Sequence, residues 1–451
     1  MRLGSGWSLS RLLVEKFPLL FLSGLSVILT DLFQASRGEV AWAPLPLLTR
    51  LIEVPVAYCF YIIKEVCPWG LSLYYPLFNK PFPALIDVAC LSLLVFLTWC
   101  VFYLNDGWRG SRPYLITGWL WFLVMLLPVV DLAAIDCFSP ADRYSYLPMI
   151  GTSLVVVWSL GDWFSKQGIS MFWRGSAYGA CGVILLGLMI LSAWQAACWA
   201  DNSRLWAHAL ECTKENPLAE LEFGWARLDE GKNREALESF QKAERINPSY
   251  ANAYFSSGSA LQRLGRLEES AAEYRSGLKA RPGDAAAHDQ LADTLVLLGQ
   301  TEEAILEYNE ALRIDPTNLK VVSKLVRVFI NSGRVAEAIA LLESTLHASS
   351  DAVNLQNDLA WILATTPEEN LRNGKKALSL ALQANKESGG QDASLLDTLA
   401  AAYAETGDFA NALEAARHAL EIAEVSGNKE LSRDLKKEIS LYEAGRPLRA
   451  P

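Results

Sequence analysis

The chain has 451 residues, enough for two or three domains, and 51% of them are hydrophobic, which is high for a wholly soluble protein. Residues 1–216 carry 14 Lys and Arg against 14 Asp and Glu, whereas residues 217–451 carry 26 against 36, so the net charge of −10 belongs to the second half. Thirteen of the 15 Trp residues precede residue 217. We therefore expect a membrane half followed by an acidic soluble half. The acidic charge of the second half argues against a nucleic-acid partner.

The first 66 residues contain two candidate membrane elements. About 20 consecutive apolar residues cross a bilayer core as a helix. Residues 17–33 nearly reach that length, and because no signal-peptide cleavage pattern follows them, we expect a retained span. Residues 47–66 include four charged residues and Pro55. We expect an interfacial or re-entrant helix there, because a sixth span would place two later basic loops opposite the basic N-terminus.

Four more apolar runs complete a predicted membrane domain over residues 1–200 with about five spans. They lie at residues 84–104, 113–131, 146–164 and 176–198. This topology places the aromatic segment at residues 67–76 and the soluble half on the extracytoplasmic face, where Trp and Tyr are typical of a belt at headgroup level. The expected location is a bacterial inner membrane, and residues 201–216 are expected to be a linker.

A charged and aromatic loop, ADRYSYLP, comes directly before the span at 146–164. Arg143 is a candidate for holding a lipid phosphate by charge-assisted hydrogen bonds, with Asp142, Tyr144 and Tyr146 in the same headgroup layer. The alternative is that Asp142 and Arg143 pair with each other and that Tyr146 only begins the next helix. Two acids that precede the loop, Asp131 and Asp136, are further candidate polar partners.

Residues 217–352 repeat with a period of 34. Turn glycines recur at 231, 265, 299 and 333, prolines at 248, 282 and 316, small residues at 236, 270, 304 and 338, and large apolar residues at 240, 274, 308 and 342. This spacing is the tetratricopeptide-repeat pattern, in which each unit is a helix–turn–helix. The small residues allow two helices to approach closely, and the glycine turns the chain between them. Four such repeats are expected here.

Degenerate repeats and a capping helix are expected over residues 353–451. Gly407, Ala412 and Ala419 restore the spacing of the repeats, and a charged final helix ends the chain. The predicted fold class is therefore all-α, with a polytopic helical membrane domain followed by a tetratricopeptide-repeat α-solenoid.

The first helix of each repeat predicts a concave face that binds an extended protein or peptide. Its candidate contact residues are Trp225, Asn252, Phe255, Arg263, Asp289, Asp293, Lys320 and Arg327. Solvated helix faces have much the same composition, so a merely solvated surface stays open as the alternative. A clamp for a terminal carboxylate is disfavoured, because it requires Lys and Asn where this chain has Leu221 and Trp225.

The motifs of soluble enzymes are missing from the sequence. It has no Gly-rich phosphate loop, nucleophile elbow or HExxH motif, and its four His residues do not form a plausible triad. All eight Cys lie between residues 59 and 212 without a paired-cysteine motif, so we interpret them as apolar packing residues. Neither a metal nor a cofactor is predicted.

The membrane half has a layout that resembles a known family. The segments EKFPLLFLSGLSVILT, CPWGLSLYYP, RPYLITGWLWFLVMLLPVV and ADRYSYLPMIG, with 34-residue repeats after the last span, are similar to bacterial relatives of the transmembrane and tetratricopeptide-repeat protein O-mannosyltransferases. The resemblance implies a C-type membrane glycosyltransferase, which takes a sugar from a polyprenyl phosphate and places it on protein hydroxyls outside the cytoplasm.

The resemblance also implies a missing part. In that family the catalytic acid lies in the first extracytoplasmic loop, and the similarity places the beginning of this chain downstream of that loop. Asp31 and Glu39 are acidic but do not match the family motif, so no residue is assigned as the general base.

Three functions remain open from the sequence. The first is a membrane-anchored repeat protein that binds protein partners outside the cytoplasm. The second is an active or split glycosyltransferase that moves a sugar from polyprenyl phosphate to Ser or Thr. The third, an envelope assembly factor or channel subunit, is weaker because no span carries a polar stripe suited to a pore.

Overall fold

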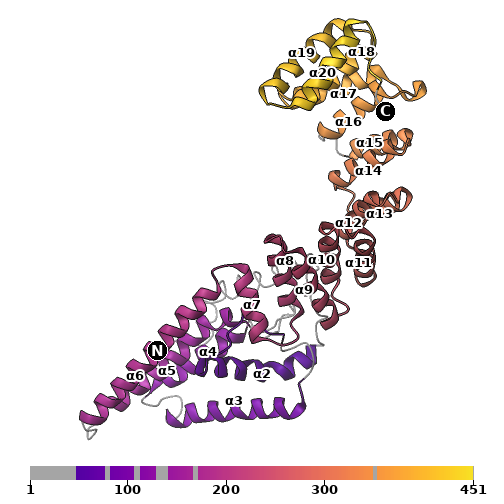
Figure 1. Ribbon diagram of the computed structural model, residues 1–451. Helices are drawn as coiled ribbons and strands as arrows, with labels where there is room; N and C mark the ends of the chain where they lie inside the picture. The colour runs from indigo at the N-terminus through magenta and orange to yellow at the C-terminus, as the bar shows by residue number, and fades with distance from the viewer. Residues whose placement is uncertain are drawn as a thin grey trace, which may run out of the picture. The chain divides into compact units, whose positions relative to one another are not determined.

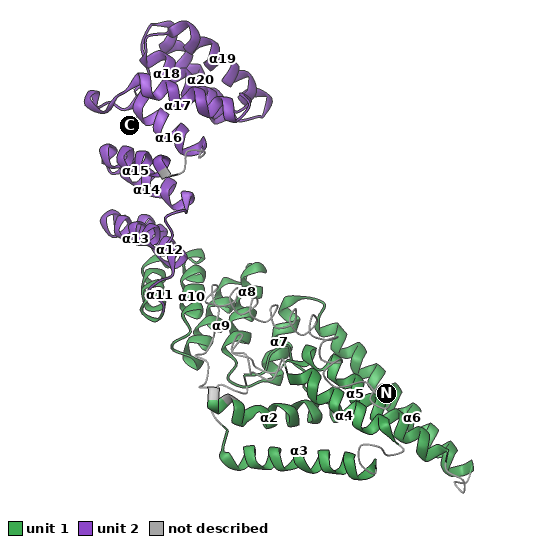
Figure 2. Cartoon of the chain, turned by 180° about the vertical axis from the view of Figure 1, so that it is seen from behind, with its two compact units in different colours: residues 1–280 green, residues 281–451 purple. Residues whose placement is uncertain are grey.

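The computed structural model of the chain is all-α. The residues it describes form helices without a β-strand, and they are 47–76, 82–105, 112–127, 141–165, 171–348 and 353–449. The chain divides into two compact units, residues 1–280 and 281–451 (Figure 2). The first unit holds the long apolar helices and the first helix pairs of the repeats, and the second holds the remaining pairs (Figure 1).

Three helices of the first unit are long and apolar enough to cross a membrane. They are α3 (Ala84–Leu104), α5 (Tyr146–Phe164) and α6 (Met171–Cys198). Neither α3 nor α6 buries a side chain within the described structure, so both present apolar residues all round, which is typical of membrane spans. A fourth apolar helix, α4 (Pro113–Leu126), is shorter.

Some of the expected membrane elements lie outside the described residues. These are the span at 17–33, the end of the span at 113–131, and the acids Asp31, Glu39, Asp131 and Asp136. The helix α6 begins at Met171, before the expected residue 176.

The helix α2 (Leu47–Val66), over the segment expected to be interfacial, packs against α4. Tyr58 and Tyr61 of α2 share a buried cluster with Trp119 and Phe122 of α4. The Tyr58 hydroxyl also donates to the carbonyl oxygen of Leu123 at 2.6 Å. This packing accounts for the aromatic side chains of α2, and its depth in a membrane stays a prediction.

Two glycines allow α4 and α5 to cross at very short range. A Cβ built on Gly118 would lie 2.3 Å from the carbonyl oxygen of Gly151, and a Cβ on Gly151 would lie 2.3 Å from that of Gly118. Any larger residue at either position would separate the helices, which is the close backbone approach that small residues permit between membrane helices.

The repeats are pairs of antiparallel helices, and α7 (Asn202–Cys212) precedes them. The first unit contains α8 (Pro217–Asp229) with α9 (Asn233–Ile246), and α10 (Ala251–Arg263) with α11 (Leu267–Ala280). The second contains α12 (Ala285–Leu297) with α13 (Thr301–Ile314), α14 (Leu319–Asn331) with α15 (Val335–Ala348), α16 (Val353–Thr365) with α17 (Gly374–Glu387), and α18 (Ala393–Glu405) with α19 (Phe409–Val425), followed by α20 (Lys429–Glu443).

The 34-residue registers correspond to distinct structural positions. The turn glycines at 231, 265, 299 and 333 all have φ of 74–75°, a left-handed conformation that glycine adopts without steric cost. The small residues at 236, 270, 304 and 338 are all 0% exposed. A Cβ on Gly224 would lie 2.4 Å from the ring of Phe240, so this glycine makes room for the aromatic residue of the same helix pair.

Candidate functional site

The loop at residues 67–76 is held by a lysine from the preceding helix. Lys64 of α2 donates from Nζ to the carbonyl oxygens of Trp69 and Gly70, at 2.8 and 2.9 Å. The same ammonium lies 4.9 Å from the ring centroid of Tyr75, a cation–π contact. Tyr75 is therefore a buried structural residue, whereas Trp69 is exposed as a belt residue would be.

Asp142 begins the short 3-10 helix η3 (Asp142–Tyr144) and faces this loop. The Tyr75 hydroxyl lies 2.9 Å from the carbonyl oxygen of Gly70 and 3.0 Å from Oδ2 of Asp142. A phenol has one proton, so Tyr75 donates to one of these oxygens unless the carboxyl brings its own proton. Burial raises the pKa of Asp142 to about 6, although the Tyr75 hydrogen bond lowers it. Asp142 therefore titrates near neutral pH.

Arg143 contacts the neighbouring Tyr144. Its guanidinium lies 4.8 Å from the ring centroid of Tyr144, and Nη2 donates to the Tyr144 hydroxyl at 2.9 Å. Arg143 is exposed, and Tyr146, the first residue of α5, is 73% exposed. Of the four lipid-phosphate candidates, Asp142 is thus bound to the loop, while Arg143 and Tyr146 are accessible.

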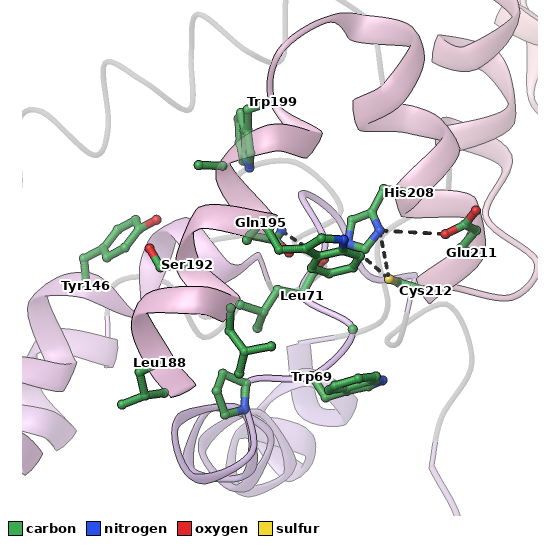
Figure 3. A pocket seen from close by; sticks show the side chains of 15 residues that line it. Trp69, Leu71, Tyr146, Leu188, Ser192, Gln195, Trp199, His208, Glu211 and Cys212 are labelled. Carbon is green, nitrogen blue, oxygen red and sulfur yellow. Dashed lines mark hydrogen bonds and ion pairs between the residues drawn. The ribbon is translucent and has the colours of Figure 1, made fainter. Parts of the chain in front are cut away.

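A cavity of about 840 Å³ lies between this loop, the second half of α6 and α7 (Figure 3). Its lining includes Leu71, Tyr146, Leu188, Trp194, His208 and Cys212. The wall from α6 is mainly apolar, and polar groups come from Ser192 and Gln195 of α6 and from His208 and Glu211 of α7. Such a cavity can hold an apolar chain with a polar end near its rim.

His208 of α7 contacts several other parts of this cavity. Its Nε2 lies 3.1 Å from the carbonyl oxygen of Leu71, which requires a proton on Nε2. The sulfur of Cys212 lies 3.5 Å from the same nitrogen, and the Trp194 ring stands edge-on at 5.1 Å (Figure 3). The imidazole therefore links α7 to the loop and to α6.

The predicted groove residues of the first unit have mixed roles. Phe255 packs into the space at Gly277, where a Cβ would lie 2.3 Å from its ring, so it contributes to the core. Trp225 is 38% exposed beside the Phe240 ring. Asn252 is half-buried on α10, and Arg263 is exposed, with Nη1 3.4 Å from the carbonyl oxygen of Leu228.

In the second unit, two predicted groove acids are paired by a residue that the sequence did not single out. Lys324 of α14 donates from Nζ to Asp289 at 2.7 and 2.9 Å and to Asp293 at 2.7 Å, and Tyr308 donates to Asp293 at 2.6 Å. Burial lowers the pKa of Lys324, but the two carboxylates together outweigh burial and raise it. Lys320 and Arg327, on the same helix, are exposed.

A groove of about 460 Å³ runs across the first helices of three successive pairs in the second unit. Its lining residues come mainly from α14, α16 and α18, and include Arg327, Asn357, Asp358, Trp361, Asp397 and Thr398. Of the predicted groove residues, Arg327 alone lies in this lining, and the others named here were missed. Nothing in the 34-residue pattern marks them, because that pattern records core positions and not surface ones.

Comparisons with known proteins identify tetratricopeptide repeats in this chain. Tetratricopeptide-repeat family models match residues 221–285, 258–318, 295–361 and 393–425. Protein O-mannosyl-transferase Tmtc3 of Drosophila melanogaster is 26% identical over 154 residues, 34% of this chain and 16% of the relative. Protein O-mannosyl-transferase TMTC1 of Mus musculus is 24% identical over 169 residues, 37% of this chain and 17% of the relative. The chain thus matches less than a fifth of the length of these relatives.

Several solved repeat proteins are similar to part of this chain. YrrB, titled a TPR protein with an unusual peptide-binding site, is 21% identical with a TM-score of 0.36, covering 45% of this chain and 99% of that one. Pseudomonas aeruginosa pilF is 20% identical with a TM-score of 0.38, covering 49% and 97%. Residues 221–361 and 393–425 are therefore tetratricopeptide repeats, and the chain is weakly similar to protein O-mannosyl-transferases over its repeat region.

Proposed function

We propose that this chain is a membrane-anchored repeat protein that binds extended segments of other proteins on the extracytoplasmic side of a bacterial inner membrane. The observation that carries the binding function is the groove across α14, α16 and α18. Three consecutive first helices contribute to it, so an extended segment that crosses it meets a new helix every few residues. Apolar residues such as Val326 and Ile362 alternate there with polar ones, which suits a chain with mixed side chains.

A displayed random-peptide library, selected on the full chain in lipid nanodiscs, tests the binding function. We expect selected peptides to bind at least about tenfold more weakly to the variant Trp361→Ala, because interface aromatic residues often dominate affinity. The matched control is Trp199→Ala, which removes an exposed Trp outside the groove. Failure to enrich any peptide, or equal binding by Trp361→Ala and the unchanged chain, would overturn the proposal.

Membrane anchoring and sidedness have their own support. Three helices have the length and composition of spans, and the topology with five spans leaves the repeats outside the cytoplasm. The repeats contain no Cys, because all eight lie between residues 59 and 212. A Ser388→Cys variant therefore gives the repeats one exposed thiol.

A membrane-impermeant maleimide applied to intact spheroplasts distinguishes the two orientations. We expect the peptide containing position 388 to be modified before the membrane is permeabilised, as read by mass spectrometry. The unchanged chain gives the background from the native thiols. Modification only after permeabilisation would place the repeats in the cytoplasm and contradict the proposed side.

Sugar transfer is a second candidate function, favoured by the cavity of about 840 Å³ that Tyr146 of the ADRYSYLP loop borders. The apolar wall that α6 contributes to this cavity suits a prenyl chain. Arg143, three residues before Tyr146, is exposed and could bind a phosphate. Purified chain in nanodiscs, given polyprenyl-phosphate mannose and a Ser/Thr peptide, would yield a heavier peptide by mass spectrometry. No transfer by the folded chain would exclude an enzyme that is active on its own.

The lipid-phosphate role of Arg143 has a separate test. Arg143→Ala is expected to weaken binding of polyprenyl phosphate about tenfold, because a charge-assisted hydrogen bond is lost. Arg204→Ala, which removes an exposed arginine of α7 that is paired with Asp201, is the control. Equal binding by both variants would show that Arg143 does not hold the phosphate.

A further inference from the structure

The groove of the second unit contains an acidic side chain with unused hydrogen-bonding capacity. Asp397 of α18 lines the groove and is only 8% exposed. Its Oδ1 accepts no hydrogen bond from any described residue. A buried carboxylate oxygen without a donor is costly, and a donor from a ligand in the groove would relieve that cost.

The helix α20 keeps Asp397 in the role of an acceptor. Glu438 of α20 is also buried, and burial, together with its hydrogen bond to Asp397, raises its pKa far above the ordinary value. Glu438 therefore carries a proton at neutral pH and donates it to Asp397. The Oδ1 atom of Asp397 is thus left as an acceptor. Burial raises the pKa of Asp397, whereas the hydrogen bond from Glu438 lowers it.

The neighbouring groups extend the acceptor site across to α16. Asp358 lines the same groove, and burial raises its pKa without an ion pair to any described residue. Asn357 contributes a buried Oδ1 that accepts no hydrogen bond within the described structure. Trp361 lies one turn further along α16 in the same wall and provides a flat ring. Carboxylates, an amide oxygen and an indole are the groups that hold an ammonium or guanidinium.

Few positively charged side chains lie near the acids of this site. Among the residues that line the groove in the described structure, Arg327 is the one cation, and it comes from α14. Lys437 contacts Asp434 on α20, Arg433 also contacts Asp434, and neither lines the groove. The acids on α16 and α18 are therefore open to a charge from a ligand.

We propose that the groove binds a Lys or Arg side chain of an extended protein segment between Asp358 and Asp397, beside Trp361. The inference rests on the proposed binding function and adds the chemistry of the ligand. The basic side chain supplies the donors that Asp397 and Asn357 lack, and the aliphatic part of that side chain covers the Trp361 ring. The partner is then selected by a positive residue within an otherwise mixed sequence.

Short acetylated and amidated peptides test the proposal on the full chain in nanodiscs, with binding read by fluorescence polarisation. We expect a positional-scanning library to favour Lys or Arg at one position. Replacement of that residue by norleucine, which keeps the aliphatic stem and removes the charge, should weaken binding at least about tenfold.

Variants of the groove identify where the charge lies. Asp397→Asn retains an oxygen for the Glu438 proton and replaces the open acceptor by a donor, so it should weaken the basic peptide about tenfold and leave the norleucine peptide unchanged. Asp358→Asn should also weaken binding of the basic peptide. It provides a second test in case Asp397→Asn fails to fold. The control, Glu421→Gln, removes an exposed acid on the second helix α19, outside the groove.

The outcomes separate this inference from the proposed function. Peptides that bind the groove without preference for a basic residue, or that bind both Asp→Asn variants as tightly as the control, would overturn the basic-residue site and leave protein binding standing. Absence of any peptide binding that depends on the groove would overturn both.

Discussion

Lys324→Met should destabilise the helix pairs around α12 and α14. Lys324 makes three contacts of 2.7–2.9 Å with Asp289 and Asp293, and the three side chains are 17–27% exposed. At an effective dielectric constant of about 20, each ion pair is worth roughly 6 kcal/mol before desolvation. Exposed pairs contribute about 0–1 kcal/mol net, and breaking a buried one costs about 3–5 kcal/mol, so this intermediate cluster should lose roughly 2 kcal/mol.

Hydrogen exchange of the full chain in detergent, read by mass spectrometry, measures this loss locally. A loss of roughly 2 kcal/mol increases the population of the open state about 30-fold, so protected amides of α12 and α14 should exchange about 30 times faster. Lys320→Met is the matched control, because Lys320 lies one turn earlier on α14 and is exposed. It should change exchange by less than about threefold.

Two results would refute this reasoning. One is equal exchange in Lys324→Met and Lys320→Met, which would mean that the cluster is as weak as an ordinary surface pair. The other is acceleration confined to α18 and α19, which would mean that the substitution acts through a part of the unit that Lys324 does not contact.

Three further predictions concern the first unit. Gly224→Val should cost about 1–3 kcal/mol, measured by exchange in α8 and α9, because its Cβ would meet the Phe240 ring; Gly283→Ala, with open space around it, is the control. Because the folded pKa of Asp142 lies above that of an unfolded Asp, stability should fall by up to about 3 kcal/mol as pH rises from about 4 through 6. Asp142→Asn should make this fall smaller by that amount in thermal melting, and an unchanged slope would contradict the prediction. Part of the slope should remain, because burial also raises the pKa of Glu244 to about 7. Tyr75→Phe should raise the pKa further, as read by the infrared band of the protonated carboxyl, because the Tyr75 hydrogen bond lowers it.

The repeats could be predicted from the sequence because their determinants are local. A glycine such as Gly265 is needed where the chain turns with positive φ, and a small residue such as Ser270 is needed where two helices touch. Both requirements recur every 34 residues, so the pattern itself contains the turn and the core positions. The long apolar helices α3 and α5 are equally local, because length and composition define them.

The sites were harder to predict because they join residues far apart in the chain. Asp142 meets Tyr75 across 67 positions, and Lys324 meets Asp289 across 35. The prediction of Lys320 and Arg327 identified the right helix, but selecting Lys324 between them requires the relative rotation of two helices. Whether the exposed predicted residues bind a ligand stays a prediction, as do the domain limits within the membrane half.

The final helix α20 does more than close the solenoid. Since Glu438 on α20 provides the proton that orients Asp397, the character of the groove depends on a segment that contributes only Leu431 to its lining. The connection to α20 passes through Gly427, whose φ is 73°. The helix α20 is also held by packing, because Leu435 and Tyr442 are buried in the apolar clusters of this unit. The selectivity of the groove is therefore set partly by a helix that lies mostly outside its lining.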